Sequence, residues 1–103
     1  MEMLNWVQEV MDNNVREAHK YAEEAFLKKP KCKAAADWCR DMANMHLQFN
    51  AGGASVMKKI IDQYEHDEEY AAHIPGAILL ADCRHAQLMK HTAEVRAMLD
   101  MYE

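Results

Sequence analysis

Apolar residues recur every three or four positions along almost the whole chain, and this spacing places them on one face of an α-helix. Only 3 Gly and 2 Pro occur in 103 residues, so few positions favour a turn. The spacing predicts a first helix from about Met3 to Lys28, which ends before Pro30 because proline disfavours helix in the preceding residue. Its expected buried positions are Leu4, Val7, Met11, Val15, Ala18, Ala22 and Ala25.

A second helix is predicted from about Cys32 to Tyr64. Its apolar positions alternate steps of four and three, the heptad pattern of helices that pack along their length. Gly52 and Gly53 lie in its middle, and each costs ~1 kcal/mol in a helix relative to Ala. They either kink the helix or admit another backbone, and a complete break that yields four helices is the alternative. The expected seam is Ala35, Cys39, Met42, His46, Phe49, Gly53, Val56 and Ile60.

A third helix is predicted from near Pro75 to the C-terminal end of the sequence, because proline suits a first helical turn. Three long helices with short connectors predict an all-α fold, an up-down-up bundle with near-antiparallel neighbours. The length fits one domain over residues 1–103. The expected seam of the third helix is Ala81, His85, Leu88, Thr92, Val95, Leu99 and Tyr102.

Charge and composition exclude several classes of protein. The chain carries 12 basic and 17 acidic residues, a net charge of −5, whereas nucleic-acid binding depends on Lys and Arg contacts with phosphates. No apolar run approaches the ~20 residues that span a membrane, and the N-terminus lacks the pattern of a signal peptide. Cys32, Cys39 and Cys83 are odd in number, which favours reduced thiols and a cytoplasmic location.

Histidines provide the one candidate for chemistry. We predict a metal set of His19, His46, Asp82 and His85, because imidazole and carboxylate ligands suit zinc or iron. Asp82 and His85 are three residues apart and share a helix face. The estimated heights of the histidines along the bundle argue against full convergence, and hydrogen-bonded core histidines are the alternative. His66, His73 and His91 are expected at the surface.

Nine methionines are many for this length. Methionine fills gaps in a core, and it also suits adaptable contact surfaces. An exposed apolar face on a flat arrangement of helices would mark an interface, most simply with further copies of the chain. The candidate interface residues are Trp6, Trp38, Met45, Met57, Met98 and Tyr102.

Several short helical stretches resemble small ferritin-like proteins of phages and prophages of Firmicutes. They are Ala36–Ile61, Met57–Tyr64 (MKKIIDQY) and Ala81–Tyr102, the last with Asp82-x-x-His85 and Ala93-Glu94-Val95-Arg96. The resemblance covers most of the chain and implies ferritin-like packing and a phage or prophage context.

The chain departs from the family pattern where metal ligands are expected. His46-Leu47-Gln48-Phe49 stands where the family carries Glu-x-x-His in its second helix, and a first-helix Glu falls at His19. Phenylalanine cannot bind metal, and a di-iron centre needs several bridging carboxylates. The resemblance therefore does not imply ferroxidase activity.

The sequence lacks a Gly-rich phosphate loop, a nucleophile elbow and zinc-finger spacing. We therefore interpret the chain as a non-enzymatic helical interaction protein, homo-oligomeric and without a cofactor. A host or phage protein, such as a host defence enzyme, is a candidate partner. The alternative is a metal-binding or vestigial di-metal bundle.

Overall fold

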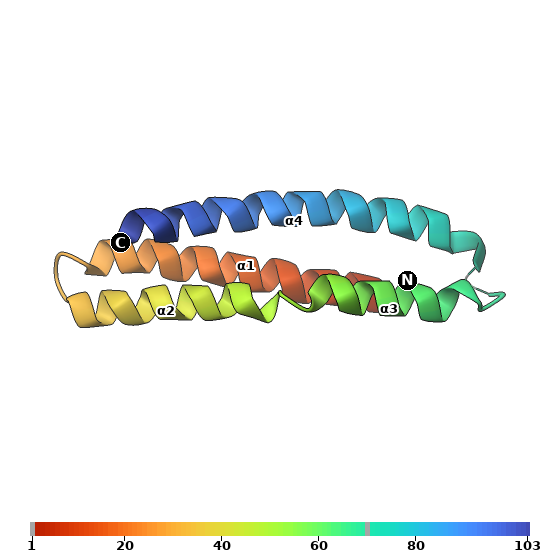
Figure 1. The fold of residues 1–103 in the computed structure, drawn as a ribbon, viewed down its shortest axis with the longest axis horizontal. Coiled ribbons are helices and arrows are strands. Elements are labelled where there is room, and N and C mark those ends of the chain that lie inside the picture. The colour runs from red at the N-terminus through yellow and green to blue at the C-terminus, as the bar shows by residue number, and fades with distance from the viewer. Residues whose placement is uncertain (1, 70) are drawn as a thin grey trace.

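The fold is three helical rods, one of which consists of two helices in line (Figure 1). A computed structural model of the chain describes residues 2–69 and 71–103, and those residues contain no strand. α1 and α4 run in the same direction and the α2–α3 rod runs opposite to both, so the all-α, up-down-up prediction is confirmed. The elements are α1 Glu2–Lys28, α2 Lys33–Phe49, α3 Gly53–Glu65, the 3-10 turn η1 Ala71–His73 and α4 Ile74–Tyr102.

The rods form a long, narrow molecule. Its principal extents are 58 × 17 × 16 Å, and its radius of gyration is 16.9 Å, against about 13 Å for a globular domain of this length. α1 packs against α2, α3 and α4, whereas the contact between α3 and α4 is slight. α1 is therefore the element around which the others assemble.

A break at residues 50–52 separates α2 from α3, so the prediction of one continuous helix over 32–64 is corrected and the four-helix alternative holds. The Asn50 side chain supports the break, because its Nδ2 donates to the Met11 carbonyl at 3.0 Å and its Oδ1 accepts from Asn14 Nδ2 at 3.0 Å. A Cβ on Gly53 would overlap the Sδ of Met11. Gly53 thus lets the start of α3 approach α1 closely.

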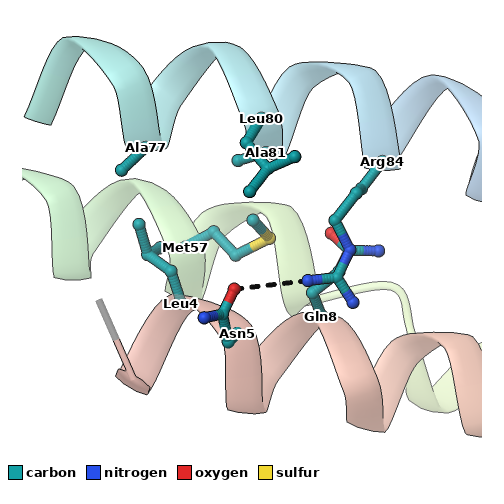
Figure 2. A pocket seen from close by; sticks show the side chains of 8 residues that line it. All are labelled: Leu4, Asn5, Gln8, Met57, Ala77, Leu80, Ala81 and Arg84. Atoms are coloured by element: carbon teal, nitrogen blue, oxygen red, sulfur yellow. Dashed lines mark hydrogen bonds between the residues drawn. The ribbon is translucent and has the colours of Figure 1, made fainter.

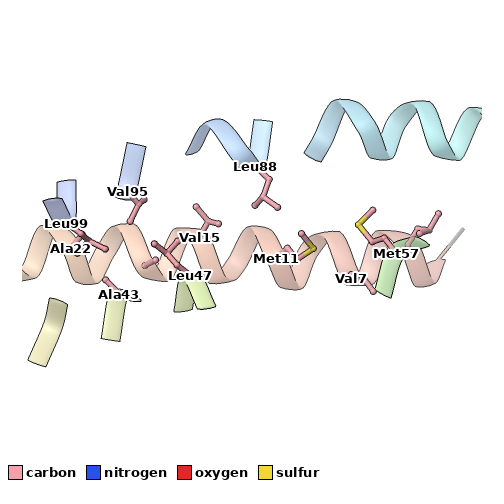
Figure 3. Close-up of a cluster of buried hydrophobic side chains, with 12 residues drawn as sticks. Val7, Met11, Val15, Ala22, Ala43, Leu47, Met57, Leu88, Val95 and Leu99 are labelled. Carbon is pink, nitrogen blue, oxygen red and sulfur yellow. The ribbon is translucent and has the colours of Figure 1, made fainter. Parts of the chain in front are cut away.

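The core lies along α1 and is reached from both neighbouring rods (Figure 3). Val95 and Leu99 of α4 enter from one side, and Ala43 and Leu47 of α2 enter from the other. Every expected core position of α1 is buried. Of the seam expected in α4, Leu88, Val95, Leu99 and Tyr102 are buried, and Ala81, His85 and Thr92 are half-buried. The buried α1 positions are Leu4, Val7, Met11, Val15, Ala18, Ala22 and Ala25.

The expected seam of the second rod is wrong at Phe49 and Val56, whereas Cys39 is buried and the other expected positions are half-buried. Phe49 is 60% exposed and Val56 is 45% exposed. On α2 the buried stripe includes two alanines and lies one residue beyond most of the expected positions, at Ala36 instead of Ala35 and at Ala43 instead of Met42. The buried positions are Ala36, Cys39, Ala43, Leu47 and Met57.

Candidate functional site

His19, one of the predicted metal ligands, pairs with a histidine that the sequence analysis placed at the surface. His19 Nδ1 lies 2.8 Å from Nε2 of His91 on α4, and His19 Nε2 lies 2.9 Å from Glu23 Oε1. When neutral His19 donates its Nε2 proton to Glu23, its Nδ1 accepts the Nε2 proton of His91. His91 follows the buried Leu88 by three residues and precedes Val95 by four, and this spacing could have placed it at the seam.

His46 faces a different part of the interior. Its ring stacks on Tyr21 of α1 at 5.6 Å between centroids and meets Phe49 edge-on at 5.6 Å. Its Nδ1 lies 3.5 Å from Asn14 Oδ1, at the limit of a hydrogen bond. The His46 ring therefore packs against α1 and lies away from α4.

The predicted metal set is not assembled. Asp82 is exposed and His85 is half-buried on α4, whereas His19 and His46 are engaged by other side chains. Throughout residues 2–69 and 71–103, no group of three or more His, Cys, Asp or Glu side chains could hold a metal ion. Because α1 and α4 lie side by side and run in the same direction, His19 contacts His91 instead of the other predicted ligands.

Two of the predicted interface residues belong to the chain's own core, which corrects that part of the prediction. Met57 is 6% exposed and packs in the main core cluster. Tyr102 is 2% exposed and packs with Ala25, Ala36 and Cys39. Neither side chain is available to a partner in this conformation.

Polar contacts also hold Tyr102 in place. Its hydroxyl donates to Asp37 Oδ1 at 2.6 Å, Lys29 Nζ donates to its carbonyl, and the Phe26 ring meets its ring edge-on at 5.8 Å. The bond to Asp37 is the main cause that raises the pKa of Tyr102 to about 12. These contacts tie the end of α4 to the connection between α1 and α2.

Other apolar side chains of α1 and α2 are exposed to solvent. Trp6 is 62% exposed and Trp38 is 65% exposed, although tryptophan is highly buried on average. Met45 is exposed and Met98 is half-buried. We define the outer apolar face by six exposed residues: Met3, Trp6 and Val10 of α1, and Trp38, Met45 and Phe49 of α2.

The two stripes of this face lie at different heights along the rod. Asn50 and Gly53 lie against Met11, so residues 3–10 of α1 run beside α3, whereas Trp38 and Met45 lie beside the second half of α1. On α1 the stripe lies on the side of the helix that also carries Asn14 and Tyr21, which face α2. On α2 it flanks His46, which faces α1. The residues of α1 that contact α4, such as Asp12 and His19, lie on a different side of α1. The outer apolar face therefore points away from α4.

A polar cluster joins α1 to α4 near the other end of the bundle. Arg84 Nη1 donates to Asn5 Oδ1 at 3.3 Å, and its Nη2 donates to Asp12 Oδ2 at 3.3 Å. Gln8 Nε2 donates to Asp12 Oδ1 at 3.0 Å. Asn5, Gln8 and Arg84 border a small pocket between α1, α3 and α4 (Figure 2), which no sequence pattern predicts.

Comparisons with protein families, with curated proteins and with solved structures give no match for this chain. Within the described residues, no helix is both long enough and apolar enough to cross a membrane.

Proposed function

We propose that the chain is a non-enzymatic helical interaction protein that associates with a second copy of itself through the outer apolar face. The observation that carries this proposal is the exposure of two tryptophans on that face, Trp6 at 62% and Trp38 at 65%. Aromatic residues and methionine are enriched at the centres of protein interfaces, where they anchor binding.

The size of the exposed surface supports a second copy as the occupant. The accessible surface is 6975 Å², whereas a compact monomer of 11.9 kDa exposes about 5,900 Å². The excess of about 1,000 Å² is similar to the ~800 Å² that each partner buries in a standard interface. A long, narrow rod offers such an area along one side, and a second copy related by a twofold axis presents the same apolar residues in return.

The phage or prophage context inferred from the resemblance is also a proposal, and the self-association does not depend on it. Neither does the proposal involve a metal. The four predicted ligands do not meet, and no specific observation favours a metal-binding role.

Light scattering after size exclusion tests the proposal at micromolar concentrations. We expect a dimer, and we expect Trp38→Lys to raise its dissociation constant at least about 30-fold, the effect of losing a 2 kcal/mol anchor. Leu79→Lys is the matched control, because Leu79 is 67% exposed on α4 and lies outside the outer apolar face. This control should dimerise like the unmodified chain.

Two outcomes would contradict the proposal. One is a monomer at all concentrations tested, including the case in which a different protein is captured by the same face. The other is a dimer that Leu79→Lys disrupts and Trp38→Lys leaves intact, since this would move the interface to α4.

A further inference from the structure

A small pocket lies between the first half of α1, α3 and the first half of α4 (Figure 2). Its volume is about 80 Å³. Leu4, Met57 and Ala81 supply apolar walls from the three helices, and the other walls are partly polar. A pocket with apolar walls and a few polar groups that fix orientation is the usual form of a small-molecule site.

Gln8 is the residue that makes this pocket unusual. Its side chain is 1% exposed, and it is the one buried polar residue among those described. The Nε2 atom donates to Asp12, which fixes the orientation of the amide, and the buried Oε1 atom has no partner within the protein. Because a buried acceptor without a donor costs free energy, a donor that reaches Oε1 would be stabilising, and it reaches Oε1 when the side chains that cover this atom shift.

Arg84 supplies the complementary group beside Gln8, since both side chains donate to Asp12 (Figure 2). Its guanidinium carries five N–H donors, of which the bonds to Asn5 and Asp12 use two, both at 3.3 Å. Asp12 balances the charge of Arg84, and the whole chain carries a net charge of −5. The pocket therefore offers one acceptor and further donors with little net charge, which favours a neutral ligand over an ion.

We propose that this pocket binds a small neutral molecule with a short apolar body and a carboxamide group. The amide N–H would donate to Gln8 Oε1, the amide carbonyl would accept from Arg84, and the apolar body would contact Leu4, Met57 and Ala81. A dry cavity of ~150 Å³ holds a benzene ring, so a volume near 80 Å³ suits a ligand of about three to five non-hydrogen atoms. Affinity for so small a ligand is roughly millimolar.

Nuclear magnetic resonance of the full chain labelled with ¹⁵N tests the proposal with propionamide as the probe. We expect millimolar binding, with shifts concentrated in residues 4–8 and 77–84. Propionate and propylammonium share the apolar body but carry a charge, and they should bind at least about tenfold more weakly. Equal binding of either ion, or no saturable shift with propionamide, would overturn the proposal.

Two variants separate the role of Gln8 from the general shape of the site. Gln8→Met keeps the length of the side chain, removes the unpartnered acceptor and should abolish propionamide binding while the protein stays folded. Gln48→Met is the matched control on the exposed surface of α2 and should bind like the unmodified chain. Unchanged binding by Gln8→Met would refute the assignment of Oε1.

Ala81→Leu provides a test that leaves Gln8 in place, should Gln8→Met fail to fold. The larger side chain fills the pocket from the α4 wall, so propionamide should no longer bind. Persistent shifts in residues 4–8 in this variant would place the ligand elsewhere and overturn the proposal.

Discussion

Replacing Gly53 with alanine is expected to destabilise the protein by about 1–2 kcal/mol. The added Cβ would overlap Met11 Sδ and lie 3.0 Å from both Cγ and Cε of that side chain, so Met11 must move within the core. Overpacking of a filled core costs ~1–3 kcal/mol, and the better helix propensity of alanine returns up to ~1 kcal/mol. The net loss should lower the melting temperature by roughly 4–12 °C.

Gly52 and Gly76 provide matched controls in the same chain. A Cβ on either meets no atom within 4 Å, so alanine fits without displacing a neighbour. Gly76 lies inside α4, where alanine should stabilise by about 0.5–1 kcal/mol through helix propensity and a restricted unfolded chain. Gly52 caps α3 in a right-handed conformation, and its replacement should change stability by less than about 0.5 kcal/mol.

Urea unfolding followed by circular dichroism at 222 nm measures these differences, at one protein concentration because association shifts apparent stability. Met11→Ala removes all three atoms that the new methyl group would meet. The double variant should therefore be less destabilised than the sum of the two single variants by about 1–2 kcal/mol. The reasoning is refuted if Gly53→Ala is as stable as Gly76→Ala, or if the two changes are additive.

Two further predictions concern polar contacts that join the rods. Asn50→Ala removes the hydrogen bonds to the Met11 carbonyl and to Asn14, so it should cost about 1–2 kcal/mol in urea unfolding, and an unchanged midpoint would contradict this role. The folded-state pKa of Tyr102 is raised from 10.0 to about 12, so its contribution is complete below pH 10 and is lost as pH rises toward 12. Tyr102→Phe should therefore be less stable than the unmodified chain at pH 9, and the difference between their urea midpoints should disappear near pH 12. A difference that does not change with pH would show that the hydrogen bond of the hydroxyl is not its cause.

The buried residues could be predicted from the sequence where a helix carries a single apolar stripe that faces the core. The apolar steps in α1 are regular from Leu4 to Ala25, and each of those positions is buried. In the second rod the four-and-three spacing fits two neighbouring stripes, and the buried one is shifted by one residue from the expected seam. Ala36, Ala43 and Leu47 are buried while Phe49 is 60% exposed, because Phe49 lies off this stripe.

The candidate sites depend on which residues of α1 and α4 lie opposite each other, and no local sequence pattern specifies this register. His19 lies opposite His91, and Asp12 lies opposite Arg84, at separations of 72 residues in both pairs. That offset is set by the lengths of the connectors and by the break after Phe49, which together decide how far α4 slides along α1. The pocket beside Gln8 follows from the same register and was therefore beyond prediction.

The contacts of Tyr102 have a consequence for motion. They stabilise one end of the bundle, where the connection between α1 and α2 lies next to the end of α4. At the opposite end, α3 and the start of α4 contribute only Met57 and Ile74 to the buried residues described. Local opening should therefore begin at that end, with backbone amides of α3 exchanging with solvent faster than those near Val95. The pocket lies between α3 and the start of α4, at the end expected to open, so a ligand can enter it while the end that contains Tyr102 stays folded.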